Sequence, residues 1–175
     1  MSDIKTLIDG LDDDFGYWIW TTNVVDEETV AECEAEIGIP FPADYKAFVL
    51  AHGCTAVLAK PEVWPRPVAY AVGPQWAFDY GFEIYGIADE IPEPLDVAER
   101  RETLVEEGIE DLLPVAGYMA RSHVLACDAR GQFYWVRHGE REPVAGTFSS
   151  IIGELFTQLA SDKDRAKAAG SSLWS

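Results

Sequence analysis

The sequence predicts one α+β domain, in which N-terminal helices pack on a mostly antiparallel sheet and a C-terminal helix closes the fold. Apolar residues at helical spacing occupy the first third of the chain, and short apolar runs broken by Gly and Pro follow from residue 55. With 175 residues, 48% of them hydrophobic, the chain can bury one core without disulfides or a metal. We expect the domain to span residues 1–160 and residues 161–175 to form a loose tail.

Three helices are predicted near the N-terminus. The first is short and amphipathic and lies between residues 2 and 16. The second should be capped by Asp26 and end at Gly38, because Asp favours the N-cap and Gly the left-handed position after a helix. The third should begin near Pro42 and end at Gly53. The last two helices are therefore expected to form a corner around an Ile-Pro-Phe-Pro connector.

The middle of the chain predicts strands separated by long connections. Tyr17–Thr22 is either a strand or an extended segment, since it is β-branched and aromatic. Ala69–Val72 and Phe82–Ile87 are the best strand candidates that follow. Residues 60–67 contain three prolines and are expected in an exposed loop. A charged surface helix is predicted over Leu95–Gly108.

The C-terminal third carries the clearest strand pattern. The runs predicted as strands are Leu113–Ala116, Val124–Asp128 and Phe133–Val136, and the last two should form a hairpin. A helix capped by Ser149 or Ser150 follows. Its predicted buried stripe consists of Ile151, Ile152, Leu155, Phe156 and Leu159.

The chain is strongly acidic, with 31 Asp and Glu against 13 Lys and Arg and a net charge of -18. Such a field repels nucleic-acid phosphates and anionic lipids and speeds encounter with cationic partners. We therefore expect neither direct nucleic-acid binding nor membrane binding; an alternative is that the acid only maintains solubility. Because neither a signal peptide nor a run of ~20 apolar residues is evident, a cytoplasmic location is expected.

Residues 30–49, with the sequence VAECEAEIGIPFPADYKAFV, resemble the opening signature of the SUKH superfamily. Three later features are similar to the same family: Phe82–Ile87, the hairpin turn at residues 128–132, and the Thr-Phe-Ser-Ser step into the last helix. The resemblance covers roughly residues 26–159, with His52-Gly53 where the family commonly has Asn-Gly. It implies a mixed α+β domain. It also implies a bacterial immunity protein that neutralises a polymorphic toxin, often a nuclease, or a Smi/Knr-type regulator like the fungal relatives.

No residue pattern points to catalysis, a metal or a cofactor. Cys54 lies two residues from His52, at a helix exit, and Cys127 lies four residues from His123, in an apolar strand. Both positions are typical of structural thiols and not of nucleophiles. The three histidines lack metal-ligand spacing, the carboxylate runs lack the EF-hand pattern, and no glycine-rich phosphate loop occurs. We therefore expect no enzyme activity, no metal and no cofactor.

Aromatic and acidic side chains gather between residues 64 and 90, where little regular structure is predicted. Protein interfaces use aromatic anchors for affinity and surrounding charge for steering. The residues predicted to bind a partner are Trp64, Trp76, Phe78, Asp79, Tyr80, Glu83, Asp89 and Glu90. An alternative is that these aromatic residues cap the sheet.

Three hypotheses follow. The leading one is a non-enzymatic immunity protein, a monomer or weak dimer, whose partner is a cognate protein toxin with a basic surface. The second is a regulatory or scaffolding module of the Smi/Knr type. The third is an enzyme that depends on Cys54 or Cys127.

Overall fold

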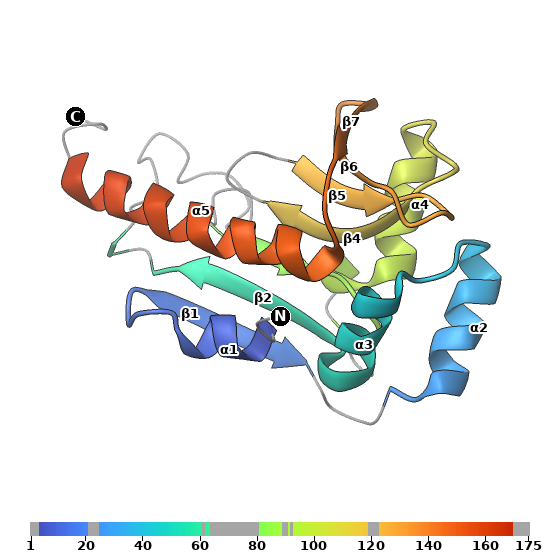
Figure 1. The fold of residues 1–175 in the computed structure, drawn as a ribbon, viewed down its shortest axis with the longest axis horizontal. Helices are drawn as coiled ribbons and strands as arrows, with labels where there is room; N and C mark the ends of the chain where they lie inside the picture. The colour runs from blue at the N-terminus through green and yellow to red at the C-terminus, as the bar shows by residue number, and fades with distance from the viewer. Residues whose placement is uncertain are drawn as a thin grey trace.

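A computed structural model describes residues 4–20, 25–60, 62–63, 81–88, 91, 93–118 and 123–169. Within them, seven strands form one sheet in which each strand pairs antiparallel with the next along the chain (Figure 1). The strands are β1 (Phe15–Trp20), β2 (Cys54–Ala59), β3 (Gly81–Ile84), β4 (Leu113–Tyr118), β5 (His123–Cys127), β6 (Phe133–Arg137) and β7 (Glu140–Val144). The helices are α1 (Ile4–Asp9), α2 (Glu27–Ile37), α3 (Ala43–His52), η3 (Glu93–Leu95), α4 (Val97–Glu106) and α5 (Phe148–Ala169). The predicted α+β class with an antiparallel sheet is confirmed.

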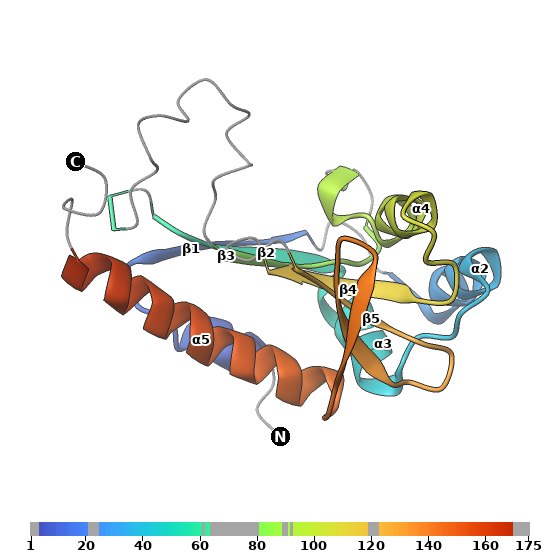
Figure 2. The same ribbon diagram turned by 90° about the horizontal axis from the view of Figure 1, so that it is seen from above.

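Helices cover both faces of the sheet. Figure 2 shows α1, α3 and α5 on one face and α4 with η3 on the other. The larger core lies under α5, whose predicted stripe is buried in full, from Ile151 to Leu159. Each such side chain stabilises the fold by about 1.5–3 kcal/mol relative to exposure. A smaller cluster around Leu104 and Leu112 joins α4 to the opposite face. The helix predicted over Leu95–Gly108 therefore exists but is shorter.

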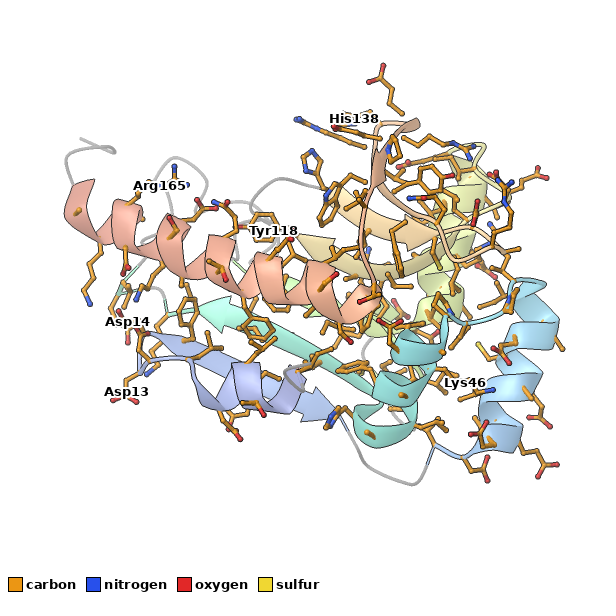
Figure 3. The ribbon with its side chains drawn as sticks, in the orientation of Figure 1. Asp13, Asp14, Lys46, Tyr118, His138 and Arg165 are labelled. Atoms are coloured by element: carbon orange, nitrogen blue, oxygen red, sulfur yellow. The ribbon has the colours of Figure 1, made fainter. Side chains whose placement is uncertain are left out.

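The predicted helical corner forms as expected. The carboxylate of Asp26 accepts a hydrogen bond from the N–H of Thr29 at 2.9 Å, and Gly38 ends α2 with a φ of 76°. Lys46 of α3 pairs with Glu34 of α2 at 3.4 Å (Figure 3). The buried hydroxyl of Tyr45 donates to the carbonyl of Tyr85 at 2.9 Å, so the corner is fixed to the end of β3.

The predicted hairpin of β5 and β6 is also confirmed. The Asp128 carboxylate accepts hydrogen bonds from the N–H groups of Arg130 and Gln132, at 2.9 and 3.0 Å, and so organises the turn. The strand expected over Phe82–Ile87 is shorter, because the chain leaves β4 after Tyr85, whose N–H still donates to the carbonyl of Val115 at 3.0 Å. Beyond it, Gly86 donates to the carbonyl of Leu95 at 3.0 Å instead of continuing along β4.

Two strands were not predicted. The sequence interpretation singled out no strand over Cys54–Ala59, yet β2 pairs with both β1 and β3. The pattern of β7 is polar, because it is an edge strand whose first four residues are exposed. Ala69–Val72 and most of residues 60–67 lie outside the described residues.

Two predictions about α5 were wrong. Its N-cap is Thr147 rather than Ser149 or Ser150, because the helix begins at Phe148 and the Thr147 hydroxyl accepts the N–H of Ser150 at 3.3 Å. The tail expected to be loose from residue 161 is helical as far as Ala169. Lys163 in this part is only 3% exposed, so tertiary contacts order the segment that the local pattern left undefined.

A candidate binding groove

Of the residues predicted to bind a partner, Glu83 alone lies in the part of the chain that the structure describes. It sits on β3, and the side chain of Arg100 from α4 lies 3.3 Å from its carboxylate. Its charge is therefore largely compensated within the protein. The other predicted residues lie outside the described ranges: Trp64, Trp76, Phe78, Asp79, Tyr80, Asp89 and Glu90.

A groove of about 530 Å³ lies between α5 and the hairpin of β6 and β7. Its volume is typical of ligand and side-chain pockets, which span about 300–1,000 Å³. In Figure 1 the hairpin rises away from the sheet beside the first turns of α5, and Figure 3 places His138 at the hairpin tip. One wall is thus a strand pair and the other a helix.

The register of the hairpin explains which side chains face the groove. Trp135 lies opposite Glu142, and Arg137 lies opposite Glu140. Because directly paired residues project to the same side of a sheet, these four side chains share one face with Val144. All five line the groove. A two-residue loop holds this register: His138 and Gly139 have φ values of 49° and 77°, as a type I′ turn requires.

The helix wall follows from the period of α5. Ile151, Glu154, Leu155 and Gln158 recur at helical spacing and all line the groove. Ile151 and Leu155 are buried at its base, whereas Glu154 is exposed at its rim.

At one end of the groove, Asp162 joins the helix to the sheet. Its carboxylate accepts the hydroxyl of Tyr118 at 2.7 Å and the amide of Gln158 at 2.8 Å. Arg165 also pairs with Asp162, and Figure 3 shows Arg165 and Tyr118 beside α5. This network ties α5 to β4 at that end of the groove.

The exposed rim of the groove carries an excess of negative charge. Among the described residues, no ion pair engages Glu140, Glu142 or Glu154. Arg141 also lines the groove, but its guanidinium pairs with Asp111, 2.8 Å away. This pairing lowers the pKa of the Asp111 carboxyl. Arg137 is the cation that remains. Among the described residues, the lining thus presents three carboxylates against two arginines, one of which is already paired with Asp111.

The thiols do not form a nucleophilic site. Burial first, and nearby carboxylates second, raise the pKa of Cys54 and of Cys127 to about 12; the chief carboxylates are Asp96 for Cys54 and Asp128 for Cys127. Burial likewise raises the pKa of Cys33 to about 11. All three are therefore protonated at neutral pH, whereas the thiolate is the form that reacts.

The described residues hold neither a metal-binding cluster nor a membrane-spanning helix. They contain no group of three His, Cys, Asp or Glu side chains that could hold a metal ion. Along the described helices, none combines the length and apolar character needed to cross a membrane.

The groove was not predicted from the sequence because its residues come from five separate elements, which are β4, β5, β6, β7 and α5. The only local signal was the His-Gly pair at residues 138–139 between an aromatic run and a charged run, which is consistent with a hairpin loop. Applying strand alternation to that hairpin would have grouped Trp135 with Glu142. The pairing with α5 was not accessible from the sequence.

A sequence model of the SMI1 / KNR4 family (SUKH-1) matches residues 24–154, which is more than half of the chain. This protein belongs to the SUKH-1 family. No match was found among curated proteins. The matched range of this SUKH-1 chain contains α2, the whole β6–β7 hairpin and the start of α5. The resemblance noted for residues 26–159 is therefore confirmed, and Leu155 and Gln158 lie just beyond the match.

Proposed function

We propose that this SUKH-1 protein is a non-enzymatic immunity protein that binds and neutralises a cognate toxin domain with a basic surface. The observation that carries the proposal is the distribution of its charge. Most described cations are consumed by internal ion pairs: Lys46, Arg100, Arg130, Arg141, Lys163, Arg165 and Lys167. With a net charge of -18, the carboxylates that remain give a surface suited to a cationic protein.

Occlusion is the mechanism that these features support. A nuclease toxin typically binds its substrate phosphates through a basic surface, and an acidic protein seated there mimics the phosphates and excludes the substrate. Examples of exposed carboxylates without an ion pair among the described residues are Glu28, Glu32 and Glu36 on α2 and Glu99, Glu102 and Glu106 on α4. Occlusion needs no turnover, which agrees with the protonated thiols.

The proposal includes the cellular setting. The protein acts in the cytoplasm as a monomer or weak dimer and contacts neither nucleic acid nor membrane directly. The aromatic and acidic segment between residues 64 and 90 stays a prediction for part of the toxin-binding surface.

Co-expression with the toxic product of the neighbouring gene tests the proposal. We expect growth to be rescued and the two proteins to co-purify. The association rate should fall steeply as salt rises, because steering is screened over about 8 Å at physiological ionic strength. Failure both to rescue growth and to form a complex would refute the proposal. If a complex forms but its association rate is independent of salt, the acidic residues contribute to solubility and not to binding.

A regulatory module of the Smi/Knr type remains the second candidate, because the matching family model is described by the SMI1 and KNR4 names. This alternative predicts a neighbouring gene without toxin character. It also predicts that the purified protein binds a signalling or envelope protein directly, with a dissociation constant measurable by calorimetry.

A further inference from the structure

Among the described residues, the lining of the groove between α5 and the β6–β7 hairpin carries more negative than positive charge. Its carboxylates at Glu140, Glu142 and Glu154 have no ion-pair partner in the described part of the chain. By contrast, Arg141 at the same hairpin is already neutralised by Asp111. A partner group that carries positive charge is therefore attracted to this rim, and an anion is repelled.

The base of the groove favours a cation with an apolar stem. Trp135 is half-buried there, its ring centroid 6.0 Å from that of His123. Ile151 and Leu155 add buried apolar surface below it. Arginine and lysine side chains lay their methylene groups on such surfaces, and their charged heads are attracted to aromatic faces.

The free edge of β7 argues against strand addition as the mode of binding. Arg137 and Glu140 flank the two-residue loop as a hydrogen-bonded pair, so Arg141 and Pro143 direct their main-chain groups outward. Pro143 has no N–H to donate. A partner strand would lose one of its main-chain bonds there, which favours binding through side chains that enter the groove.

We propose that the groove binds an arginine or lysine side chain of the partner protein. The carboxylates of Glu142 and Glu154 hold the charged head, and Trp135 contacts the methylene stem. This inference rests on the proposed function, since it specifies which part of a basic toxin surface enters the immunity protein. Arginine is the better occupant of the two, because its planar head both pairs with carboxylates and stacks on aromatic rings.

Short peptides test the groove without the toxin. The probes are two end-blocked peptides, Gly-Leu-Arg-Leu-Gly and Gly-Leu-Glu-Leu-Gly, titrated into the full chain and followed by NMR. We expect the arginine peptide alone to shift the indole N–H resonance of Trp135. In the Glu142→Gln, Glu154→Gln double variant the dissociation constant should rise about fivefold to tenfold, as expected for two partly exposed ion pairs.

A matched double variant separates the groove from the overall charge. Glu102→Gln, Glu106→Gln removes the same charge from the exposed face of α4 and should leave the peptide dissociation constant within twofold. The inference is overturned if Trp135 does not respond to the arginine peptide. It is also overturned if both peptides bind alike or if the α4 variant weakens binding as much as the groove variant.

The toxin complex distinguishes failure of the inference from failure of the proposed function. A complex that forms with an unchanged dissociation constant in the Glu142→Gln, Glu154→Gln variant refutes the groove and leaves the immunity function standing. Peptide binding in the groove without rescue or complex formation refutes the toxin partner and leaves the groove as a cation-binding site.

Discussion

Carboxylates gather at two places along α5, and they differ in whether the protein supplies the cation. Near the C-terminal end, the Lys163 ammonium lies 2.6 Å from Asp12, 3.1 Å from Asp14 and 3.0 Å from Asp164. Its side chain is 4% exposed, and the ring of Phe15 lies 5.4 Å away. Near the N-terminal end, the groove presents Glu142 and Glu154, neither of which has an ion-pair partner among the described residues.

The comparison separates charges used for folding from charges available for binding. A buried ammonium is costly unless carboxylates surround it, so Lys163 requires its partners in the folded state. Exposed carboxylates at the groove rim are hydrated and cost little when left unpaired. The first cluster therefore contributes to stability, whereas the second contributes to affinity for a cationic partner.

Loss of the buried cation should have the largest effect. We expect Lys163→Ala to lower the free energy of unfolding by about 2–4 kcal/mol, because it removes a packed stem and leaves Asp12 and Asp164 without this cation. Asp14 keeps Lys167 as its partner. Urea denaturation measures the change. Lys163→Met keeps most of the stem and should cost less. If Lys163→Ala unfolds at the wild-type urea concentration, the cluster does not stabilise the fold.

Acid should weaken the Lys163 cluster more than the groove. Hydrogen bonds from Lys167 first, and from Lys163 second, lower the pKa of Asp14 below 3.8. A carboxyl whose pKa is depressed by folding contributes stability above its unfolded pKa and loses that contribution as pH falls through the folded value. The urea midpoint of the wild type should therefore decrease below about pH 4.

Two variants of equal charge test this assignment. The urea midpoint of Lys163→Met should decrease less steeply with falling pH than that of the wild type, because one of the two hydrogen bonds that lower the pKa of Asp14 is gone. Arg137→Met loses the same charge at the groove, and its urea midpoint should depend on pH as steeply as that of the wild type. If the urea midpoints of Lys163→Met and the wild type depend equally on pH, Lys163 does not contribute to the loss of stability in acid.

A cation introduced into the groove should make its carboxylates internally paired, as the carboxylates around Lys163 are. Gln158→Lys puts an ammonium one turn after Glu154 and one turn before Asp162, where it can replace the hydrogen bond that the Gln158 amide donates to Asp162. An i,i+4 ion pair stabilises a helix by about 0.2–0.5 kcal/mol. The stability change should be this small, while affinity for the arginine peptide falls severalfold. Thr157→Lys adds the same charge outside the groove lining and should change the peptide affinity less than twofold. Equal losses in both variants would attribute the effect to net charge.

The features that the sequence predicted correctly all have local causes. Asp26 begins α2 and Gly38 ends it through contacts within a few residues. The β5–β6 hairpin has a short turn organised by Asp128. The SUKH signature is likewise contiguous, and the family match to residues 24–154 confirms it. Such features can be read from the sequence because the groups that make them are neighbours along the chain.

The features that were missed depend on distant partners. The polar strand β7 exists because β6 provides a ladder for it, and its face toward the groove follows from the register of Trp135 and Glu142. The last turns of α5 have weak local signals. They are fixed by contacts with the loop between α1 and β1, such as that of Lys163 with Asp12. The candidate site could not be predicted for the same reason, since α5 and the hairpin meet only in the folded chain.

The sequence by itself determined that the protein is acidic, which family it belongs to and where its main helices begin. Composition and contiguous motifs are sufficient for these properties. Only the tertiary structure decided which charges are compensated: Lys163 pairs with Asp12, a residue 151 positions earlier, whereas Glu154 meets no internal cation in the described part of the chain. Electrostatic compensation depends on distances of a few ångströms between groups far apart in the chain, and folding sets those distances.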